Sequence, residues 1–430
     1  MASEVGAPTR TSPNEDIELQ LGIGQTEEHR TKQHPEVSNE TSAITPLALT
    51  PTASNDGNIG ALIPYILRGY FITTAWMAIP YGVAFFGWLL AAVFGGYVRS
   101  VLGSGGYIAA GASFQVFAQL LRFWKPPFGV FAASFVFIAL GQAFQDTQAN
   151  TYVATINQAH RWLGLTHGCY AIGLLVGPLV AAAIASNFNG QWATFYYVPA
   201  GIGAFNLALT VYVFRDEMSF FQRHHGTQAQ QHGDLRRSTV ARRELAATLK
   251  LKSVWLISLF YFVHLGAGIT AGGWVVEYLH VVRGGALSQV GYISSGFYGG
   301  NALGRFVLAE PTFRFGEKRM LLIYALLSVA LQIVFWRVSN IVVDAVVTSI
   351  IGFCWGLCFL LVYRKLISTE LQSSGLAMVF VMAQAGGAMF PAVTGIISAE
   401  AGVDTLQPIL VRLLAMMAIS WFFVPDPKKV

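Results

Sequence analysis

The sequence predicts an all-α integral membrane protein. Of its 430 residues, 54% are hydrophobic and only 11% are charged, whereas a soluble domain carries about a quarter charged residues. Too few charges are present to cover the two or three soluble domains expected at this length. The apolar stretches are also continuous and close to the ~20 residues that a helix needs to cross a bilayer. A transmembrane β-barrel would instead show strict alternation, so spanning helices are expected.

The first 50 residues differ from the rest of the chain. They are rich in Glu, Thr, Ser and Pro and hold eight acidic residues against three basic ones. This composition predicts a disordered cytoplasmic tail over residues 1–50. No charged segment followed by an apolar one resembles a signal peptide, so the first membrane helix is expected to act as the insertion signal.

Eleven clear membrane spans follow the tail. A further candidate at 54–67 precedes them and is short, with a weakly apolar neighbour upstream. Twelve helices therefore require a short first helix, which either begins near Ala43, or places its polar residues on a cavity, or is incomplete. The eleven clear spans are predicted at 73–98, 102–123, 128–155, 161–186, 192–214, 253–282, 286–309, 319–338, 341–363, 372–398 and 405–424.

One long connection, residues 215–252, divides the spans into six and six. It holds eight basic residues against four acidic ones. When the short first helix is counted as the first span, the loops after even-numbered spans also carry most of the other loop Lys and Arg residues. This distribution places these loops and both termini in the cytoplasm. We therefore expect a six-helix bundle over 51–214, a basic cytoplasmic linker and a second six-helix bundle over 253–430. The net charge of +5 reflects these loops and does not indicate nucleic-acid binding.

The two halves repeat short patterns at a similar offset. Gly177-Pro178 in the span 161–186 is matched by Pro391 in the second half, and the Phe-Gly-Gly-Tyr-Val-Arg-Ser segment at 94–100 is matched by Ala-Leu-Gly-Arg-Phe at 302–306. Parallel repeats related by an axis along the membrane normal are a known plan of transporters.

These patterns, together with five further segments, resemble the major facilitator superfamily, and within it a fungal branch of fucose-permease-like transporters. The five segments are Asn55 to Tyr65, Asp146 to Asn150, Leu163 to Pro178, Gly272-Gly273-Trp274 and Leu406-Gln407-Pro408.

The resemblance implies twelve helices in two six-helix bundles, a central cavity and alternating access that is often coupled to protons. In such relatives, an acidic residue in helix 1 and another in helix 4 or 7 handle protons or substrate. Asp56 and Asp146 occupy matching positions. The chain departs from these relatives at Gly268, where they often carry an acid, and between the second and third helices, where only Arg99 remains of the usual signature.

Asp146 is the sharpest candidate for chemistry. A carboxylate deep in a membrane span costs about 2.5–3.5 kcal/mol on insertion scales and normally faces protein or water. At about 100° per residue, Gln142, Asp146, Asn150 and Asn157 share one helix face. The functional interpretation is that Asp146 exchanges a proton while the three amides bind the solute. The alternative is a structural hydrogen-bonded cluster.

Four further residues have a functional and a structural interpretation each. Asp56 is either part of a broken helix on a cavity or a surface helix cap. His167 either relays protons or is a neutral hydrogen-bonding residue. Trp274, beside two glycines, is either an aromatic platform for a ring-shaped solute or core packing. Glu277, near the end of its span, is either functional or interfacial.

A second group of residues is expected to serve gating or structure. Gly173 and Gly177 allow close helix contact, and Pro178 frees a backbone carbonyl and can kink its helix. Arg305 and Arg314 flank the connection after the eighth helix, where they either form a gating latch between the bundles or anchor the loop by the positive-inside rule.

The sequence indicates no enzyme. Nucleophile-elbow, zinc-protease and phosphate-loop motifs are all missing, and no cofactor or metal site is predicted. The three cysteines lie in apolar runs and indicate no disulfide framework. We therefore expect a monomeric multi-pass transporter of the plasma membrane that moves a small organic solute, sugar-like or a secondary metabolite, with protons. The alternative is a receptor, scaffold or degenerate carrier that no longer transports.

Overall fold

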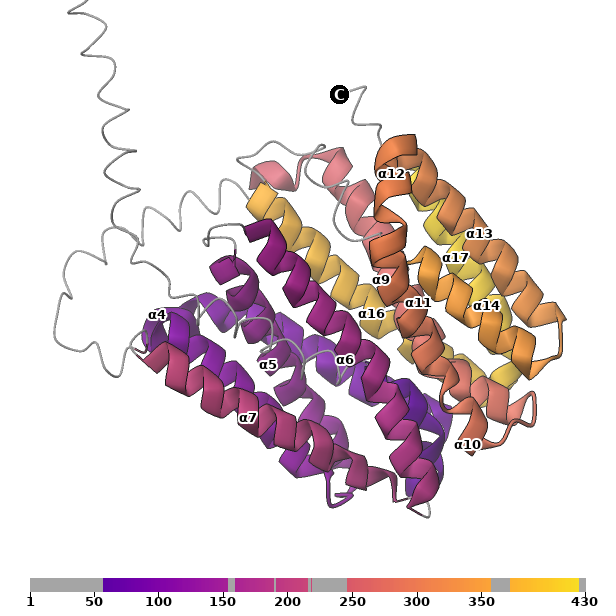
Figure 1. Cartoon of the computed structure of the whole chain (residues 1–430), viewed down its shortest axis with the longest axis horizontal. Helices are drawn as coiled ribbons and strands as arrows, with labels where there is room; N and C mark the ends of the chain where they lie inside the picture. The colour runs from indigo at the N-terminus through magenta and orange to yellow at the C-terminus, as the bar shows by residue number, and fades with distance from the viewer. Residues whose placement is uncertain are drawn as a thin grey trace, which may run out of the picture.

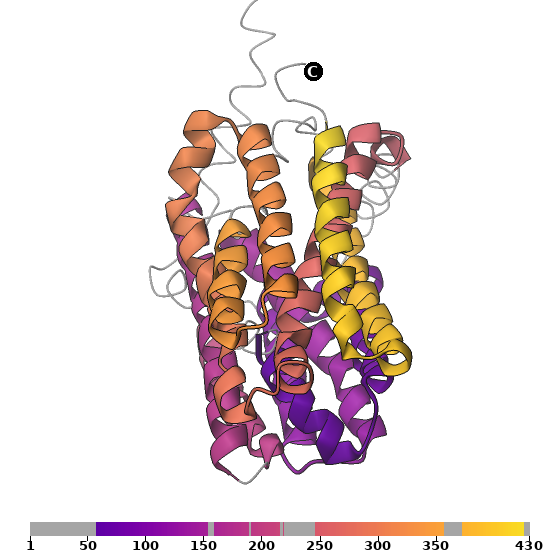
Figure 2. The ribbon, with the colours of Figure 1, turned by 90° about the vertical axis from the view of Figure 1, so that its right-hand side faces the viewer.

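The computed structural model describes residues 57–153, 159–188, 191–215, 218, 246–356 and 372–424. Within these residues the regular elements are all helical, as predicted. Eight helices are long and apolar enough to cross a membrane, and Ile341–Cys354 is a shorter apolar one. Figure 2 shows the helices of the C-terminal half running side by side toward the end of the molecule where the chain finishes.

The N-terminal half begins with a helix over residues 57–70, which is followed by η1 (Thr74–Met77) and α4 (Ala78–Arg122). The remaining helices are α5 (Phe128–Val153), α6 (Ala159–Asn187), η2 (Trp192–Tyr196) and α7 (Tyr197–Phe214).

The C-terminal half contains eight helices in chain order within the described residues. They are α9 (Lys252–Val281), α10 (Leu287–Val290), α11 (Ile293–Val307), α12 (Ala309–Phe315), α13 (Glu317–Arg337), α14 (Ile341–Cys354), α16 (Gln372–Ala401) and α17 (Leu406–Phe423), with the short η5 (Val403–Thr405) before the last.

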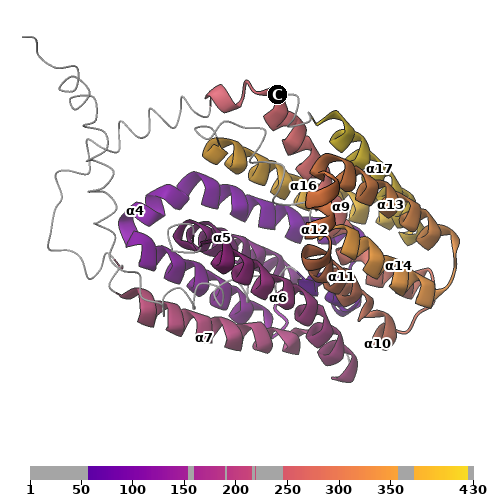
Figure 3. The ribbon, with the colours of Figure 1, turned by 45° about the horizontal axis from the view of Figure 1, so that its top comes forward.

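The helix α4 contains two of the predicted spans. They meet at Gly103, whose φ of 75° interrupts the helical backbone. Such a φ suits glycine because it lacks a Cβ, so the chain turns without a loop. Figure 3 shows this turn at the left of the molecule. The interruption lies at the start of the predicted span 102–123, two residues after the gap that follows the span 73–98.

The short first helix belongs to the core of the protein. Leu62, Ile63 and Ile66 have no exposed surface. Its first described residue, Gly57, lies against the Leu174 carbonyl and the ring of Pro178 in α6, where an added Cβ would approach within 2.7 Å of that carbonyl oxygen. The absence of a backbone N–H in Pro178 leaves the Leu174 carbonyl without its helical donor. The first helix therefore packs against α6 where α6 lacks one backbone hydrogen bond.

The two halves lie side by side in Figure 1, with α4, α5 and α7 on the left and α13, α14 and α17 on the right. Helix α16 packs on both α9 and α4, and α11 packs on α6. We call the surface between the halves the seam. We call the end of the molecule opposite the C-terminus, with the connections 71–73, 123–127 and 282–286, the distal end.

Candidate functional site: the seam between the halves

An ion pair joins the halves at the distal end. Arg68, in the first helix, donates hydrogen bonds to both carboxylate oxygens of Glu277 in α9, at 3.1 and 3.4 Å. The Glu277 side chain is 6% exposed and the Arg68 side chain 43% exposed. Arg68 also donates to the Pro64 carbonyl at 2.6 Å, which orients its guanidinium toward the seam. Glu277, considered from sequence as either functional or interfacial, is therefore buried between the halves.

Backbone contacts close the seam beside this ion pair. Gly60 lies so close to Gly272 of α9 that an added Cβ would overlap the Gly272 carbonyl oxygen. The Thr74 hydroxyl donates to the carbonyl of Gly395 in α16 at 2.8 Å. Small residues permit this approach, so the distal end is sealed by two backbone contacts and one ion pair.

Aromatic side chains fill the seam around the same glycines. Tyr81 of α4 is buried, lies against Gly273 and makes no hydrogen bond through its hydroxyl among the described residues. Tyr298 of α11 packs on Gly272. Trp274 is fully buried and donates from its indole nitrogen to the Pro391 carbonyl at 3.1 Å. Trp274 therefore lies in the packed interior, and its role toward a solute stays a prediction.

Two predicted residues lie together nearer the C-terminal end. Arg305 of α11 interacts electrostatically with both His167 and Tyr170 of α6, so the seam has a cationic position here. Arg314 instead pairs with Glu310 within α12 at 2.5 Å, and both side chains are well exposed. Of the two arginines considered for gating, only Arg305 lies at the seam.

The structure describes part of the polar face that was predicted on the span 128–155. Along α5, Gln142 is buried, Asp146 is half-buried and Asn150 is exposed. The degree of burial therefore falls toward the C-terminal end of the helix. Asp56 and Asn157 lie outside the described residues.

The predicted small-residue segment of α6 is a packing surface. Gly173, Gly177 and Pro178 are all buried, and this segment receives the first helix at Gly57. This arrangement agrees with the close-packing interpretation of the glycines.

Several buried polar groups were not singled out from sequence. Gln115 of α4 donates to Gln145 of α5 at 2.5 Å. Arg122 of α4 donates to the Ser134 hydroxyl at 2.6 Å and stacks on Phe135 at 3.9 Å from the ring centroid. Gln115, Gln145 and Arg122 are polar residues inside apolar spans, and the same feature singled out Asp146. Among the described residues, no group of three His, Cys, Asp or Glu side chains could hold a metal ion.

Comparison with known proteins identifies the family. The profile of the Major Facilitator Superfamily matches residues 47–391. The chain belongs to the major facilitator superfamily. It is also 24% identical over 397 residues to Bypass of stop codon protein 6 of Saccharomyces cerevisiae (strain ATCC 204508 / S288c), covering 86% of this chain and 79% of that protein.

Solved structures of this superfamily share the fold. The D-xylose-proton symporter aligns with a TM-score of 0.72 at 12% identity, covering 91% of this chain and 99% of that one. A mutant form of the nucleoside transporter NupG aligns at 0.67 and 14% identity, covering 89% and 98%. A mutant form of the E. coli fucose:proton symporter, FucP, aligns at 0.60 and 16% identity, covering 89% and 98%.

These matches confirm the predicted twelve-helix major-facilitator fold and the multi-pass membrane character of this superfamily member. The non-transporting alternative drew on the weak first helix. The structure weakens that argument, because residues 57–70 form a buried helix that contacts both α6 and α9.

Proposed function

We propose that this major-facilitator protein moves a small hydroxyl-bearing organic solute by alternating access, coupled to protons. The observation that carries the proposal is the seam. Its distal end is closed by contacts between single residues, the Arg68–Glu277 ion pair and the Thr74–Gly395 hydrogen bond. Contacts of this kind can be broken without unfolding either half, which rocking of two bundles about a central site requires.

In this mechanism the solute binds between the halves. Gln142 and Asn150 offer amide donors and acceptors on one face of α5, and Asn157 would extend this face. Amide groups suit hydroxyl-bearing ligands because they both donate and accept hydrogen bonds. The three structural neighbours support this class, since their names give D-xylose, a nucleoside and fucose as the transported compounds.

Asp146 is the proposed coupling carboxylate, with Asp56 and His167 as its partners in proton transfer. A charged carboxylate inside the membrane opposes reorientation of the empty carrier, whereas its protonated form is neutral. Arg305, facing His167 at the α6–α11 contact, is proposed to take part in the gate nearer the C-terminus. We place that end of the molecule in the cytoplasm, as the loop charges predict.

The test is transport in vesicles by purified wild-type protein and the Asp146→Asn variant, with radiolabelled D-xylose, fucose and a nucleoside as solutes. We expect Asp146→Asn to lose accumulation driven by a pH gradient and to keep part of the solute exchange, because the solute site survives while the proton site does not. Glu400→Gln, which removes an exposed carboxylate at the distal end of α16, is the matched control and should accumulate solute normally.

Two results would contradict the proposal. Full pH-driven accumulation by Asp146→Asn would remove Asp146 from the coupling mechanism. Failure of the wild-type protein to transport or exchange any of the three solutes would contradict the assigned class of solute.

A further inference from the structure

A buried carboxylate lies inside the C-terminal half, away from the seam. Asp344, in the first turn of α14, has no exposed surface. Its Oδ2 accepts a hydrogen bond from Arg283 Nε at 3.2 Å, while its Oδ1 is buried without a hydrogen-bond partner among the described residues. A buried carboxylate oxygen left unsatisfied is costly, so this atom is expected to have a partner, either a water molecule or a proton.

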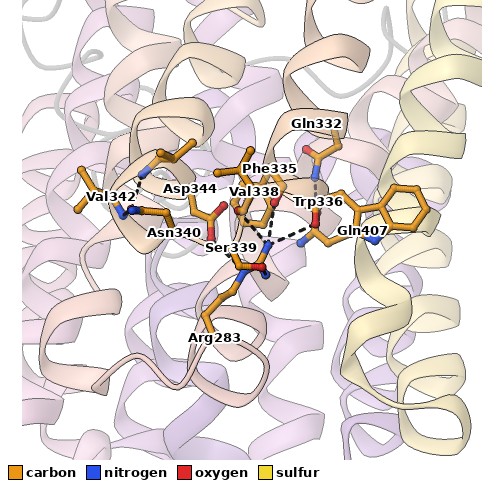
Figure 4. A network of polar contacts seen from close by, with 11 residues as sticks. Arg283, Gln332, Phe335, Trp336, Val338, Ser339, Asn340, Val342, Asp344 and Gln407 are labelled. Atoms are coloured by element: carbon orange, nitrogen blue, oxygen red, sulfur yellow. Dashed lines mark hydrogen bonds and ion pairs between the residues drawn. The ribbon is translucent and has the colours of Figure 1, made fainter.

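Arg283 does not depend on Asp344 for its hydrogen bonds. Its guanidinium also donates to the Ser339 hydroxyl at 2.5 Å and to the carbonyls of Phe335, Trp336 and Val338 at 2.9, 3.4 and 3.2 Å. Figure 4 shows these acceptors gathered around the guanidinium at the end of α13. Neutralising Asp344 would therefore leave Arg283 satisfied, which distinguishes this pair from one in which each ion is the other's sole partner.

A small cavity lies between α9, α11, α13, α14 and α17, one helical turn along α14 from Asp344, which is not itself a lining residue. It has a volume of about 20 Å³, and its polar lining comes from Gln332 of α13, Gln407 of α17 and Thr348 of α14. Thr348 is one helical turn after Asp344 and therefore on the same face of α14. The Gln332 amide donates to the Gln407 side chain, and Figure 4 shows this pair beside the Arg283 cluster. A polar cavity of this size can hold a water molecule.

The other charged and titratable groups around Asp344 come from α9 and η5. Tyr278 of α9 interacts electrostatically with Arg283, Asp344 and Asp404 of η5. The helices α13 and α17 present neutral amides on the cavity side. Among the described residues, Arg283 and Tyr278 are therefore the charged and titratable groups that interact with Asp344, and Asp404 interacts with Tyr278.

We propose that Asp344 is a proton-binding site inside the C-terminal half, and that the neighbouring cavity lined by Gln332, Gln407 and Thr348 tunes the titration of its carboxyl group through its polar surroundings. Protonation removes the charge from the contact between the end of α9 and the start of α14 while the backbone carbonyls hold Arg283 in place. This site is separate from Asp146, and the proposal does not rest on the transport function.

The experiment is infrared difference spectroscopy of the purified full-length protein, titrated between about pH 4 and pH 9, the range in which a buried carboxyl group titrates. It needs no solute. We expect a carboxylic-acid C=O band that titrates in the wild-type protein, is missing from Asp344→Asn and persists in Asp146→Asn. Identical spectra of the wild-type protein and Asp344→Asn would show that Asp344 is a permanently charged structural partner of Arg283, and would overturn the proposal.

Variants of the cavity test its influence and remain informative if Asp344→Asn does not fold. Thr348→Val and Gln332→Leu leave the Arg283–Asp344 pair intact and remove polar lining. Each should raise the titration midpoint of the Asp344 band, because less polar surroundings disfavour the charged carboxylate. An unshifted band in both variants would show that the cavity does not influence Asp344.

Discussion

Replacing Gly386 with alanine is expected to destabilise the C-terminal half more than any conservative change on its surface. An added Cβ at Gly386 of α16 would overlap the carbonyl oxygen of Phe262 in α9, and a Cβ at the facing Gly266 would lie 2.7 Å from the Gly386 carbonyl oxygen. The obstacle to a Cβ at Gly386 is the backbone of Phe262, so no side-chain rotation relieves it. Overpacking costs about 1–3 kcal/mol, and we expect Gly386→Ala at the upper end of that range.

Thermal denaturation of the purified protein, followed by tryptophan fluorescence, measures this loss. Gly82→Ala is the matched control, because a Cβ at Gly82 of α4 meets nothing within 4 Å. Alanine is also the better helix former by about 1 kcal/mol, so the control should melt at or above the wild-type temperature. Equal melting temperatures of Gly386→Ala and the wild-type protein would show that α9 and α16 can separate at little cost.

The membrane spans could be predicted because hydropathy is a local property. The spans expected at 128–155 and 253–282 correspond to α5 at Phe128–Val153 and α9 at Lys252–Val281. The interruption at Gly103 was also indicated, to within two residues, by the gap between two predicted spans. A helix that must cross lipid needs a continuous apolar stretch of known length. Such a stretch can be recognised from consecutive residues alone.

The partners of polar residues could not be predicted, because they depend on which helices meet. Arg68 and Glu277 are 209 positions apart, and nothing in either neighbourhood indicates that they pair. Asp344 lies in the first turn of its helix, where an acid is ordinary on helix-dipole grounds, so its complete burial could not be inferred. Asp146 was singled out because it is a carboxylate inside an apolar span; it lies half-buried on α5, and its role stays a prediction.

In the candidate site, too, local features could be predicted from the sequence, whereas contacts between helices could not. Glycine spacing indicated that α6 makes close contacts, and Gly57 lies against that segment. The contact between Gly60 and Gly272 was not expected, because Gly272 was considered only as a neighbour of Trp274. Small residues reveal that a helix can approach another closely, whereas the identity of the other helix follows only from the assembled fold.

Breaking the Arg68–Glu277 pair is expected to open the distal end of the seam. In Arg68→Gln, the Glu277 carboxylate keeps its buried position, 6% exposed, and loses the cation that compensates it. Leaving one member of a buried pair alone is strongly destabilising, although the partial exposure of Arg68 reduces the effect. Since opening the seam returns Glu277 to water, the variant should favour the open conformation. We expect at least a tenfold increase in the open population, equivalent to ~1.4 kcal/mol.

Cysteine labelling measures this population. A reporter cysteine at Thr74→Cys, which is buried in the seam, is placed in a chain whose three native cysteines are replaced by alanine, and labelled with a membrane-impermeant maleimide. Arg68→Gln and Glu277→Arg should each label faster than this parent. The exchanged pair Arg68→Glu with Glu277→Arg should recover most of the slow labelling, because it restores opposite charges across the seam.

The exposed ion pair of α12 provides the control. Glu310→Gln breaks the Glu310–Arg314 bond of 2.5 Å, which lies within a single helix and joins no two parts of the molecule. Surface pairs of this kind contribute about 0–1 kcal/mol, so labelling of Thr74→Cys should not change. If Arg68→Gln labels as slowly as Glu310→Gln, the ion pair is not what holds the distal end closed, and the Gly60–Gly272 contact, which the reporter chain keeps, accounts for the seal.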